Sequence, residues 1–517
     1  TFDSGTVTGG TGPCIEVWGP AATFTDCNFT VLNATNPSHF QATAVAVSYG
    51  GTAVIDGGTY TSNGYGAYVY SSGGTINILD GTVSGNVAAA KSDVDAGTYP
   101  SAVATVNISG GTIQGALTTN GNVKATISVS GGTFDQAVPE EYCAPGMKPI
   151  TDGEGNYTVT TDTSIFTSGN GTATSPFIID SVDKLEAFRD SVNNGTTYEG
   201  QYIQLADGTY ELSGEWEPIG NGTRDGAGYS GDSFQGHFDG NGQTITGLSI
   251  SSASGADTAV GLFGVVDGGT VENLTLSGVK INVPSNECAG GAIGLLTGGG
   301  TADQITVYGT VSAARGNGGI VGRMTISGTI SNCTNHAEIS GTGANVGGIV
   351  GAAYYTGDYA SGVSPMYITN CTNNGTITGT AGGVGGIVGL SSAHVSGCTN
   401  TADITGNGAD VGGIVAEQQN YGSVIDCTNS GTITNENKTA YGTGGIVGWV
   451  RYNGETDDYP TKAIIEIRNN TNSGTIDGGN DGGGIVGTVY NAAVVTGNEN
   501  TAESITGATF AAGIVGN

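Results

Sequence analysis

Apolar residues in the second half of the chain recur in short clusters, each set between glycines and polar runs. A Gly-Gly-Ile-Val cluster begins at residues 318, 347, 385, 412, 444 and 483, and a Gly-Ile-Val-Gly remnant begins at residue 513. A second signature, Cys-Thr-Asn, begins at residues 333, 371, 398 and 427 and relaxes to Asn-Thr-Asn at 470 and Asn-Glu-Asn at 498. Two signatures that alternate along a chain indicate a repeat architecture, so the pattern predicts a solenoid with one coil per repeat.

The spacing divides each repeat into a constant and a variable part. From Cys-Thr-Asn to the last glycine of the next Gly-Ile-Val-Gly the separation is 17 to 21 residues, whereas the return separation ranges from 9 to 22 residues. A constant part must stay in register with its neighbours above and below, and a variable part contains a corner from which loops can leave. We therefore expect three short strands per coil and insertions at one corner.

Residues 1–160 carry a looser repeat, in which an alternating strand is followed by a glycine turn, a threonine and an apolar residue. The apolar anchors of successive copies lie 21 to 31 residues apart and are Phe29, Tyr60, Val83, Ile113 and Phe134. One period-2 strand in a coil of this length suits a parallel β-helix. Residues 138–159 predict a terminal cap, because an open solenoid end exposes unpaired strand edges.

One amphipathic helix is predicted, at residues 181–193, with Asp180 or Ser181 as its N-cap and the apolar face Val182, Leu185, Phe188 and Val192. We interpret it as a lid over the first coil. The predicted fold class is all-β: a right-handed parallel β-helix in two stacked or tandem sections with this one capping helix. The predicted domains are an N-terminal β-helix with its cap (1–160), a leader with the helix and first coils (161–250), and a repeat β-helix (251–517).

The repeats, together with the leader and with Val260-Gly261-Leu262-Phe263-Gly264, resemble the GLUG-motif repeats of bacterial surface proteins over residues 165–517. Residues 50–160 resemble the Gly-Gly-Thr β-helix segments of surface proteins of gut anaerobes. The resemblance implies an exported bacterial protein with right-handed β-helices. GLUG repeats occur in adhesins and in IgA-cleaving metallopeptidases, but no HExxH motif is present, so the sequence does not support a peptidase activity.

The net charge and the distribution of apolar residues exclude several kinds of partner. Thirteen basic residues against 45 acidic ones give a net charge of −32, which argues against nucleic acid and anionic membranes as partners. No apolar run approaches 20 residues, so no membrane insertion is expected in this segment. The chain begins at Thr1 without a signal-peptide pattern, so we expect a processed or truncated form of an extracellular, cell-surface protein.

Two repeat positions predict ladders through the stack. Leucine and isoleucine occupy the first position in earlier coils, so its cysteines are expected to point inward as packed thiols, with disulfides between coils as the alternative: Cys333, Cys371, Cys398 and Cys427. Asparagine at the second position can adopt left-handed backbone and bond its stacked copies: Asn335, Asn373, Asn400, Asn429, Asn472 and Asn500. Cys14 and Cys27 are the candidate conventional disulfide.

The two longest insertions carry the candidate ligand-binding residues, because aromatic rings with carboxylates can stack on sugars and hold their hydroxyl groups. These residues are Tyr354, Tyr355, Tyr359, Trp449, Arg451, Tyr452, Asp457 and Asp458. Asp457 and Asp458 are also a candidate Ca²⁺ site, and no other cofactor is expected. The alternative is that both loops only cover the solenoid side.

These observations predict a non-enzymatic surface protein that serves as a rigid spacer, an adhesin or a filament component. Its expected partners are glycans, host or cell-surface proteins, or further copies of itself joined end to end. No catalytic residues are predicted, because the four histidines lie in unrelated contexts and the acids are scattered. The alternatives are a carbohydrate-active β-helix enzyme, a polysaccharide lyase or glycoside hydrolase, and a section of a phage tail spike.

Overall fold

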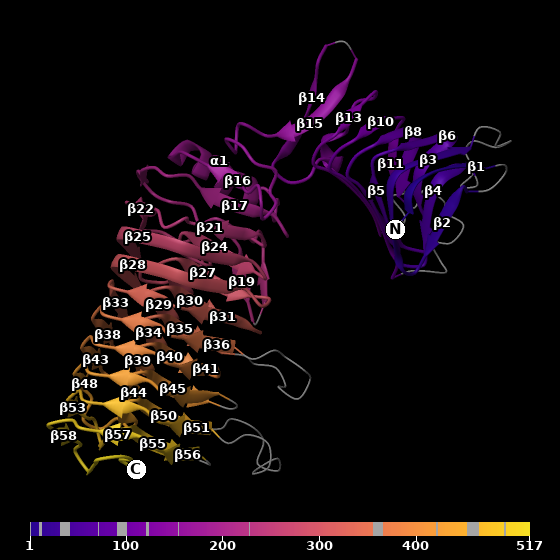
Figure 1. The fold of residues 1–517 in the computed structure, drawn as a ribbon. Coiled ribbons are helices and arrows are strands. Elements are labelled where there is room, and N and C mark those ends of the chain that lie inside the picture. The colour runs from indigo at the N-terminus through magenta and orange to yellow at the C-terminus, as the bar shows by residue number, and fades with distance from the viewer. Residues whose placement is uncertain are drawn as a thin grey trace. The chain divides into compact units, whose positions relative to one another are not determined.

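The computed structural model describes residues 2–9, 13–31, 42–70, 72–89, 101–119, 124–153, 155–226, 228–354, 366–419, 422–451, 465–490 and 493–517. The chain forms two compact units, Thr1–Gly171 and Thr172–Asn517. Each is a stack of short strands, almost all of them parallel (Figure 1). The predicted all-β solenoid class is therefore confirmed.

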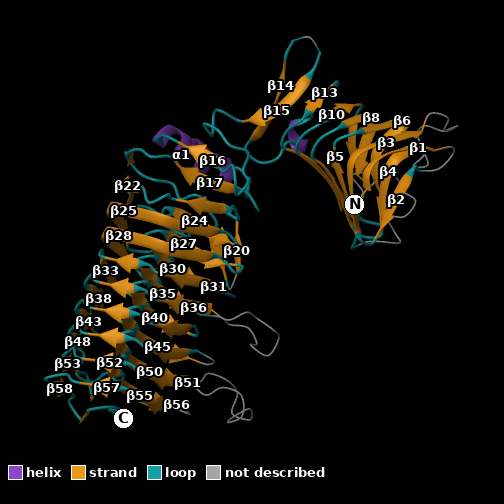
Figure 2. Cartoon of the chain, viewed as in Figure 1, coloured by secondary structure: helices purple, strands orange, loops and turns teal. Residues whose placement is uncertain are grey.

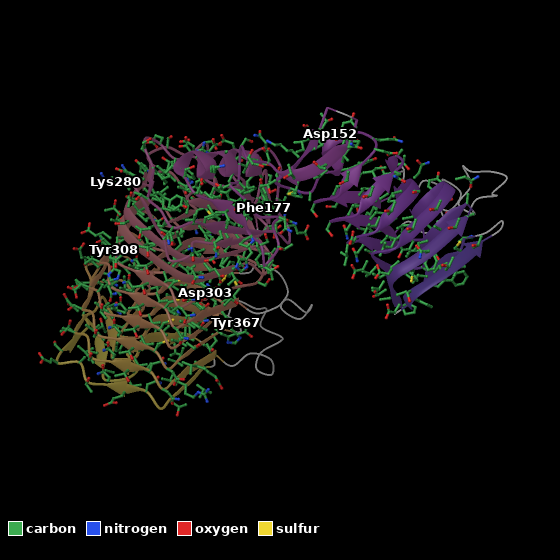
Figure 3. All side chains as sticks on the ribbon, turned by 45° about the horizontal axis from the view of Figure 1, so that its top comes forward. Asp152, Phe177, Lys280, Asp303, Tyr308 and Tyr367 are labelled. Atoms are coloured by element: carbon green, nitrogen blue, oxygen red, sulfur yellow. The ribbon has the colours of Figure 1, made fainter. Side chains whose placement is uncertain are left out.

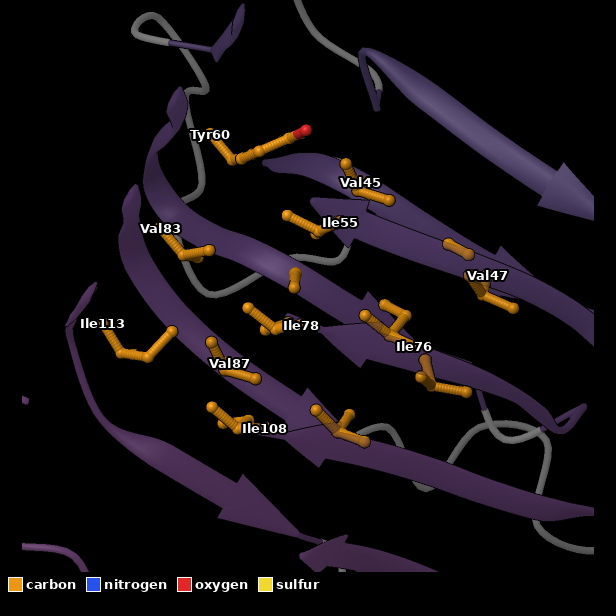
Figure 4. Close-up of a cluster of buried hydrophobic side chains, with 14 of the residues drawn as sticks. Val45, Val47, Ile55, Tyr60, Ile76, Ile78, Val83, Val87, Ile108 and Ile113 are labelled. Atoms are coloured by element: carbon orange, nitrogen blue, oxygen red, sulfur yellow. The ribbon is translucent and has the colours of Figure 1, made fainter. Parts of the chain in front are cut away.

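Unit 1 is a 15-stranded sheet whose coils each turn at a glycine corner. The predicted anchors stack in register, Phe29 beside Tyr60, then Val83, Ile113 and Phe134, and all five are buried. Figure 4 shows three of them, Tyr60, Val83 and Ile113, within the apolar core of the unit. The main strands are β3 (Ala21–Val31), β5 (Gly51–Asp56), β6 (Thr59–Val69), β7 (Gly74–Ile78), β8 (Thr82–Ala89), β9 (Val103–Ile108), β10 (Thr112–Gln114), β12 (Lys124–Val129) and β13 (Thr133–Phe134).

The glycine corner of unit 1 has a steric cause at Gly58, between β5 and β6. Gly58 has a φ of +82°, and a Cβ atom there would lie 1.9 Å from the carbonyl oxygen of Cys27 in the preceding coil. Only glycine allows both this backbone conformation and this close approach. The corner therefore fixes how tightly successive coils stack.

The parallel stack of unit 1 ends at an antiparallel hairpin. Strand β15 (Tyr157–Thr161) pairs antiparallel with β13 on one side and with β14 (Met147–Thr151) on the other. The hairpin therefore covers the edge that the last parallel strand would otherwise expose. It overlaps residues 138–159, from which the sequence predicts a cap, and extends two residues beyond them.

Near its start, after strand β16 (Phe177–Ile179), unit 2 forms helix α1 (Val182–Val192), as the sequence predicts. The Ser181 hydroxyl accepts the Lys184 N–H at 3.4 Å and caps the helix. Leu185, Phe188 and Val192 are buried, and the Phe188 ring packs on Phe234 and Phe238 of the first coils. The helix therefore covers the end of the solenoid core (Figure 2).

Three parallel sheets line the sides of the unit 2 solenoid. Sheet S1 has 26 strands, from β16 (Phe177–Ile179) to β58 (Ile505–Thr506). Sheet S2 comprises β24 (Phe263–Asp267), β27 (Ile293–Thr297), β30 (Val321–Met324), β35 (Val350–Ala353), β40 (Val388–Ser391), β45 (Val415–Gln419), β50 (Val447–Arg451) and β55 (Val486–Tyr490). Sheet S3 comprises β26 (Ala289–Gly290), β29 (Asn317–Gly318), β34 (Val346–Gly347), β39 (Val384–Gly385), β44 (Val411–Gly412), β49 (Thr443–Gly444), β54 (Asp481–Gly483) and β59 (Phe510–Ala512).

A repeat coil has five short strands rather than the three predicted. In one coil, β34 lies in S3, β35 in S2, and β36 (Met366–Thr369), β37 (Thr372–Asn373) and β38 (Ile377–Gly379) in S1. The Gly-Gly-Ile-Val signature forms the turn from S3 to S2. Its Ile349 and Val350 are buried, and the isoleucine of Gly-Thr-Ile, Ile377, is 1% exposed. These aliphatic positions stack from coil to coil as the core.

Candidate functional site

The cysteine position is buried in the stack. Each of the four ladder cysteines is a free, buried thiol, and its Sγ donates to the carbonyl oxygen two residues earlier at 3.1–3.4 Å. The two following coils have Asn470 and Asn498 at this position, and Asn470 accepts the Cys427 backbone N–H at 2.9 Å. The structure therefore has packed thiols here rather than disulfides between coils.

The asparagine position forms a continuous ladder in the interior of unit 2. Each side-chain amide donates to the oxygen of the next asparagine at 2.7–2.8 Å, from Asn335 through to Asn500. The same amide nitrogen also donates to a carbonyl two residues later, as Asn400 does to Ala402 at 2.9 Å. The ladder satisfies buried backbone carbonyls that water cannot reach.

The left-handed corner lies one residue before the cysteine position and not at the asparagine ladder, where we expected it. The residues there have φ between 53° and 65°: Asn332, Asn370, Gly397, Asp426, Asn469 and Gly497. None of the six ladder asparagines has positive φ, because they lie in or next to the middle strands of S1, such as β37. The alternation of Asn, Asp and Gly is the sequence signal for this corner.

The candidate disulfide between Cys14 and Cys27 is absent, and the geometry of the first coils gives the reason. The structure has a thiol at each position. Cys14 Sγ donates to the carbonyl of Thr30 at 3.3 Å, whereas Cys27 Sγ donates to the carbonyl of Phe2 at 3.5 Å. Thr30 lies three residues along β3 from Cys27, or about 10 Å, which is beyond disulfide reach.

Both long insertions leave the solenoid where S2 passes to S1. One joins β35 to β36 and the other joins β50 to β51 (Ile465–Arg468). Of the eight predicted ligand-binding residues, Tyr354, Trp449 and Arg451 are described. The other five, including the candidate Ca²⁺ pair, lie outside the described residues: Tyr355, Tyr359, Tyr452, Asp457 and Asp458.

Trp449 and Arg451 are brought together with Glu417 on S2. Glu417 of β45 stands in register with Trp449 of β50 in the next coil. The Arg451 guanidinium forms an ion pair with the Glu417 carboxylate, and its carbon lies 5.7 Å from the centre of the Trp449 ring. Trp449 is half-buried, and its indole Nε1 is a buried atom with no hydrogen-bond acceptor in the described part of the chain. We call Glu417, Trp449 and Arg451 the S2 site.

Two buried carboxyl groups belong to the same region. Asp481 accepts the backbone N–H groups of Gly442 at 2.7 Å and Thr443 at 3.2 Å. Burial raises the pKa of the Asp410 carboxyl to about 8, and the charges of Glu417 and Asp481 act in the same direction while Arg451 opposes them. Asp410 is therefore protonated at neutral pH and can donate a hydrogen bond, whereas Glu417, paired with Arg451, can accept one.

The arrangement suits a polyhydroxylated ligand. A partly exposed aromatic face with carboxyl groups beside it is the kind of surface that holds sugar rings and their hydroxyls. The carboxyl groups here are mostly covered, with Glu417 7% and Asp410 9% exposed. Within the described residues no group of three or more His, Cys, Asp or Glu is placed to hold a metal ion. Sequence reasoning missed Asp410, Glu417 and Asp481, although Glu417 follows a Gly-Ile-Val cluster at a position where other coils have Leu390 or Ala352.

The outer face of S1 carries exposed aromatic side chains. Tyr308 and Tyr367 are both 42% exposed (Figure 3). Tyr308 stacks on His336 with ring centres 4.4 Å apart, and Tyr367 stacks on His394 at 5.6 Å. Each ring is thus paired with the ring of the next coil, and Tyr367 lies in a strand of S1 and not at the S2 site.

Comparison with known proteins finds a family motif within unit 2. A family model described as the GLUG motif matches residues 407–434, which run from the corner holding Asp410 through the β45 strand of Glu417. The chain carries the GLUG motif. The resemblance predicted from the repeats is therefore confirmed, and the repeats of this GLUG-containing chain are the coils of unit 2.

Two curated relatives match part of the chain. A protein provisionally named as a Gly-rich membrane protein, from Evansella cellulosilytica, is 36% identical over 152 residues, 28% of this chain and 16% of the relative. Halomucin of Haloquadratum walsbyi is also 36% identical, over 154 residues, 28% of this chain and 2% of the relative. The chain thus spans less than a fifth of the length of either relative. These names agree with a GLUG-containing surface protein.

A solved structure from Bacteroides ovatus, provisionally assigned as an immunoglobulin A1 protease, is similar at 20% identity and a TM-score of 0.39. The match covers 68% of this chain and 87% of that one. In this chain no described helix is long and apolar enough to cross a membrane.

Proposed function

We propose that this protein is a non-enzymatic, extracellular surface protein, a rigid scaffold that binds glycans at the S2 site. The observation that carries the proposal is Trp449, a ring that stays partly exposed beside the Glu417–Arg451 ion pair. A tryptophan with a purely structural role in the core would be fully buried.

The scaffold role is supported by the interior of unit 2. Core aliphatic residues, thiols and asparagines stack coil on coil, and each coil contacts mainly its neighbours. Such solenoids are stabilised by nearest-neighbour interfaces and tolerate insertions at their corners. The insertions can therefore vary without disturbing the stack, which suits a protein that presents binding loops.

The extracellular location is supported by the relatives named as a membrane protein and as halomucin, and by the net charge of −32. Acidic charge favours solubility at a surface and opposes anionic partners elsewhere on the molecule. Host or cell-surface proteins and end-to-end self-association remain the competing partners.

A glycan array with the full chain tests the proposal. We expect binding to one class of glycan, lost in Trp449→Ala and kept in Trp18→Ala, a matched exposed tryptophan in unit 1. No glycan binding in the wild-type chain, or equal binding by Trp449→Ala, would contradict the proposal. Pull-down of a protein partner and self-association in analytical ultracentrifugation identify the competing partners.

A second candidate function, glycoside hydrolysis, is favoured by one observation. Burial raises the pKa of Asp410 to about 8, and Glu417 lies nearby in an ion pair with Arg451; a glycosidase needs a carboxylic acid and a second carboxyl group. Reducing sugar released from glycans bound on the array, and lost in Asp410→Asn, would establish this function. Binding without release favours the non-enzymatic scaffold.

A further inference from the structure

The basic residues of this acidic chain are unevenly placed. The sequence has six arginines in 517 residues, and three of them line one cavity of about 230 Å³ in unit 2. Its wall is made by Arg224, Arg315, Arg323, Glu287, Asn345 and Tyr354. We call this cavity the arginine cleft. Half of the arginines in a chain of net charge −32 therefore line one cavity.

Each arginine reaches the cleft from a different element. Arg224 comes from β19 (Thr223–Asp225), which forms an antiparallel hairpin with β20 (Gly228–Ser230). Arg315 lies between β28 (Thr301–Ala313) and β29, and Arg323 lies in β30 of S2. Residues about 100 apart in the sequence thus converge on one cavity, which only the folded solenoid provides.

The cleft has more positive than negative charge. Glu287 is the carboxylate on its wall, and it lies 3.8 Å from Arg315 Nη1 and 4.0 Å from Arg323 Nη2. Both distances are too long for hydrogen bonds, so this carboxylate offsets charge without engaging those N–H groups. Arg224 has its own partner outside the wall, Asp257. Three guanidinium groups therefore share the cleft with one carboxylate.

Several donors in the cleft lack acceptors. The Nε of Arg224 is buried and has no hydrogen-bond partner in the described residues. The Arg323 side chain is 12% exposed, and its Nε donates to the Glu287 backbone carbonyl at 2.7 Å. Burial lowers the pKa of Arg323, and the neighbouring charges of Arg224 and Arg315 also lower it. An anion in the cleft would relieve this repulsion and accept the unused N–H groups.

We propose that the arginine cleft binds the negatively charged group of an acidic sugar, the carboxylate of a uronic acid or a sulfate ester. Guanidinium groups bind planar or tetrahedral oxyanions through paired N–H donors. The cavity is smaller than the pockets that enclose drug-sized ligands, so it suits a single sugar residue.

The position of the cleft links it to the S2 site. Arg323 lies on β30 and Trp449 on β50, with β35, β40 and β45 between them. Four strand spacings correspond to about 19 Å, which a short oligosaccharide can span. Tyr354, the first residue of one long insertion, stands on the cleft wall. The proposal extends the glycan-binding function and names its ligand as acidic.

Isothermal titration calorimetry on the full chain, at low ionic strength, tests the cleft by itself. The probes are D-glucuronate, glucose 6-sulfate and neutral methyl glucoside. We expect at least one charged probe to bind, with more than tenfold weaker binding in Arg315→Gln and with weakening by added salt. The charged probe that binds distinguishes the carboxylate source from the sulfate source.

Arg468→Gln is the matched control, because Arg468 is 46% exposed and lies 3.8 Å from its carboxylate partner, against 45% and 3.8 Å for Arg315. Unchanged binding in this control assigns the effect to the cleft. The inference is overturned if neither charged probe binds, if the neutral probe binds as well, or if Arg468→Gln weakens binding equally. Trp449→Ala leaves the arginine cleft intact. If this variant loses glycan binding at the S2 site but still binds glucuronate, the cleft proposal stands independently of the S2 proposal.

Discussion

Replacing Asn400 by alanine should destabilise unit 2 more than any single surface substitution. Asn400 donates to Ala402 O at 2.9 Å and to Asn429 Oδ1 at 2.8 Å, and it accepts from Asn373 Nδ2 at 2.8 Å. In Asn400→Ala these three buried groups lose the hydrogen bonds that they make with Asn400, and each unsatisfied group costs about 1–3 kcal/mol. We expect a loss of at least about 3 kcal/mol in the free energy of unfolding.

The position in the ladder provides an internal comparison. Asn500 is half-buried at the last rung and accepts one ladder bond, from Asn472. Asn500→Ala should therefore cost about 1 kcal/mol, because water can replace that partner. Asn374→Ala, on the surface beside the ladder, should cost less than about 0.5 kcal/mol.

Urea titrations followed by far-UV circular dichroism measure these differences through the midpoint and slope of the unit 2 transition. The ladder interpretation requires Asn400→Ala to be clearly less stable than Asn500→Ala. Equal midpoints for the two variants, or for Asn400→Ala and Asn374→Ala, would refute it.

Three further predictions concern thiols, protons and the unit 1 corner. A thiol reagent should label at most the two half-buried cysteines, Cys14 and Cys143, rapidly in the native protein and all eight after denaturation, and fast native labelling of four or more would contradict the buried stack. The pKa of Asp410 is about 8 in the folded state and about 3.9 in the unfolded state, so the folded state binds the extra proton between these values. The free energy of unfolding should therefore fall by a few kcal/mol as the pH rises from 4 to 8. Asp410→Asn should remove the Asp410 contribution to the shift of the urea midpoint over this pH range, and an unchanged shift would exclude Asp410 as its source. Gly58→Ala should cost more than about 2 kcal/mol by thermal unfolding because of its left-handed backbone and the clash with Cys27, whereas Gly19→Ala, with a φ of +72° and open space around it, should cost less.

The sequence was sufficient to predict the repeated positions that stack from coil to coil. The Gly-Gly-Ile-Val and Cys-Thr-Asn signatures recur with regular spacing through most coils of unit 2. One spacing argument therefore predicts the solenoid, its inward positions and the corner where insertions leave. The helix was equally accessible, because Ser181, Leu185 and Phe188 form a local capping and burial pattern. Local signals of this kind depend on neighbours in sequence.

Properties that arise from contacts between coils were not accessible. The side chains of Asp410, Glu417 and Asp481 meet across coils, and each acid alone resembles a surface residue of a repeat. The arginine cleft depends on how the β19–β20 hairpin folds over coils about 90 residues later. Even the corner was misassigned, because asparagine suits both the ladder and left-handed backbone, and only the pairing of β32 (Thr334–Asn335) with β37 assigns Asn335 to the ladder.

The affinity of Trp449→Ala for the glycan selected on the array tests the central claim most directly. With Trp18→Ala as control, calorimetry should show a loss of more than about 2 kcal/mol, roughly thirtyfold in Kd, at the Trp449 position alone. Wild-type affinity in Trp449→Ala, or an equal loss in Trp18→Ala, would contradict a glycan site on S2.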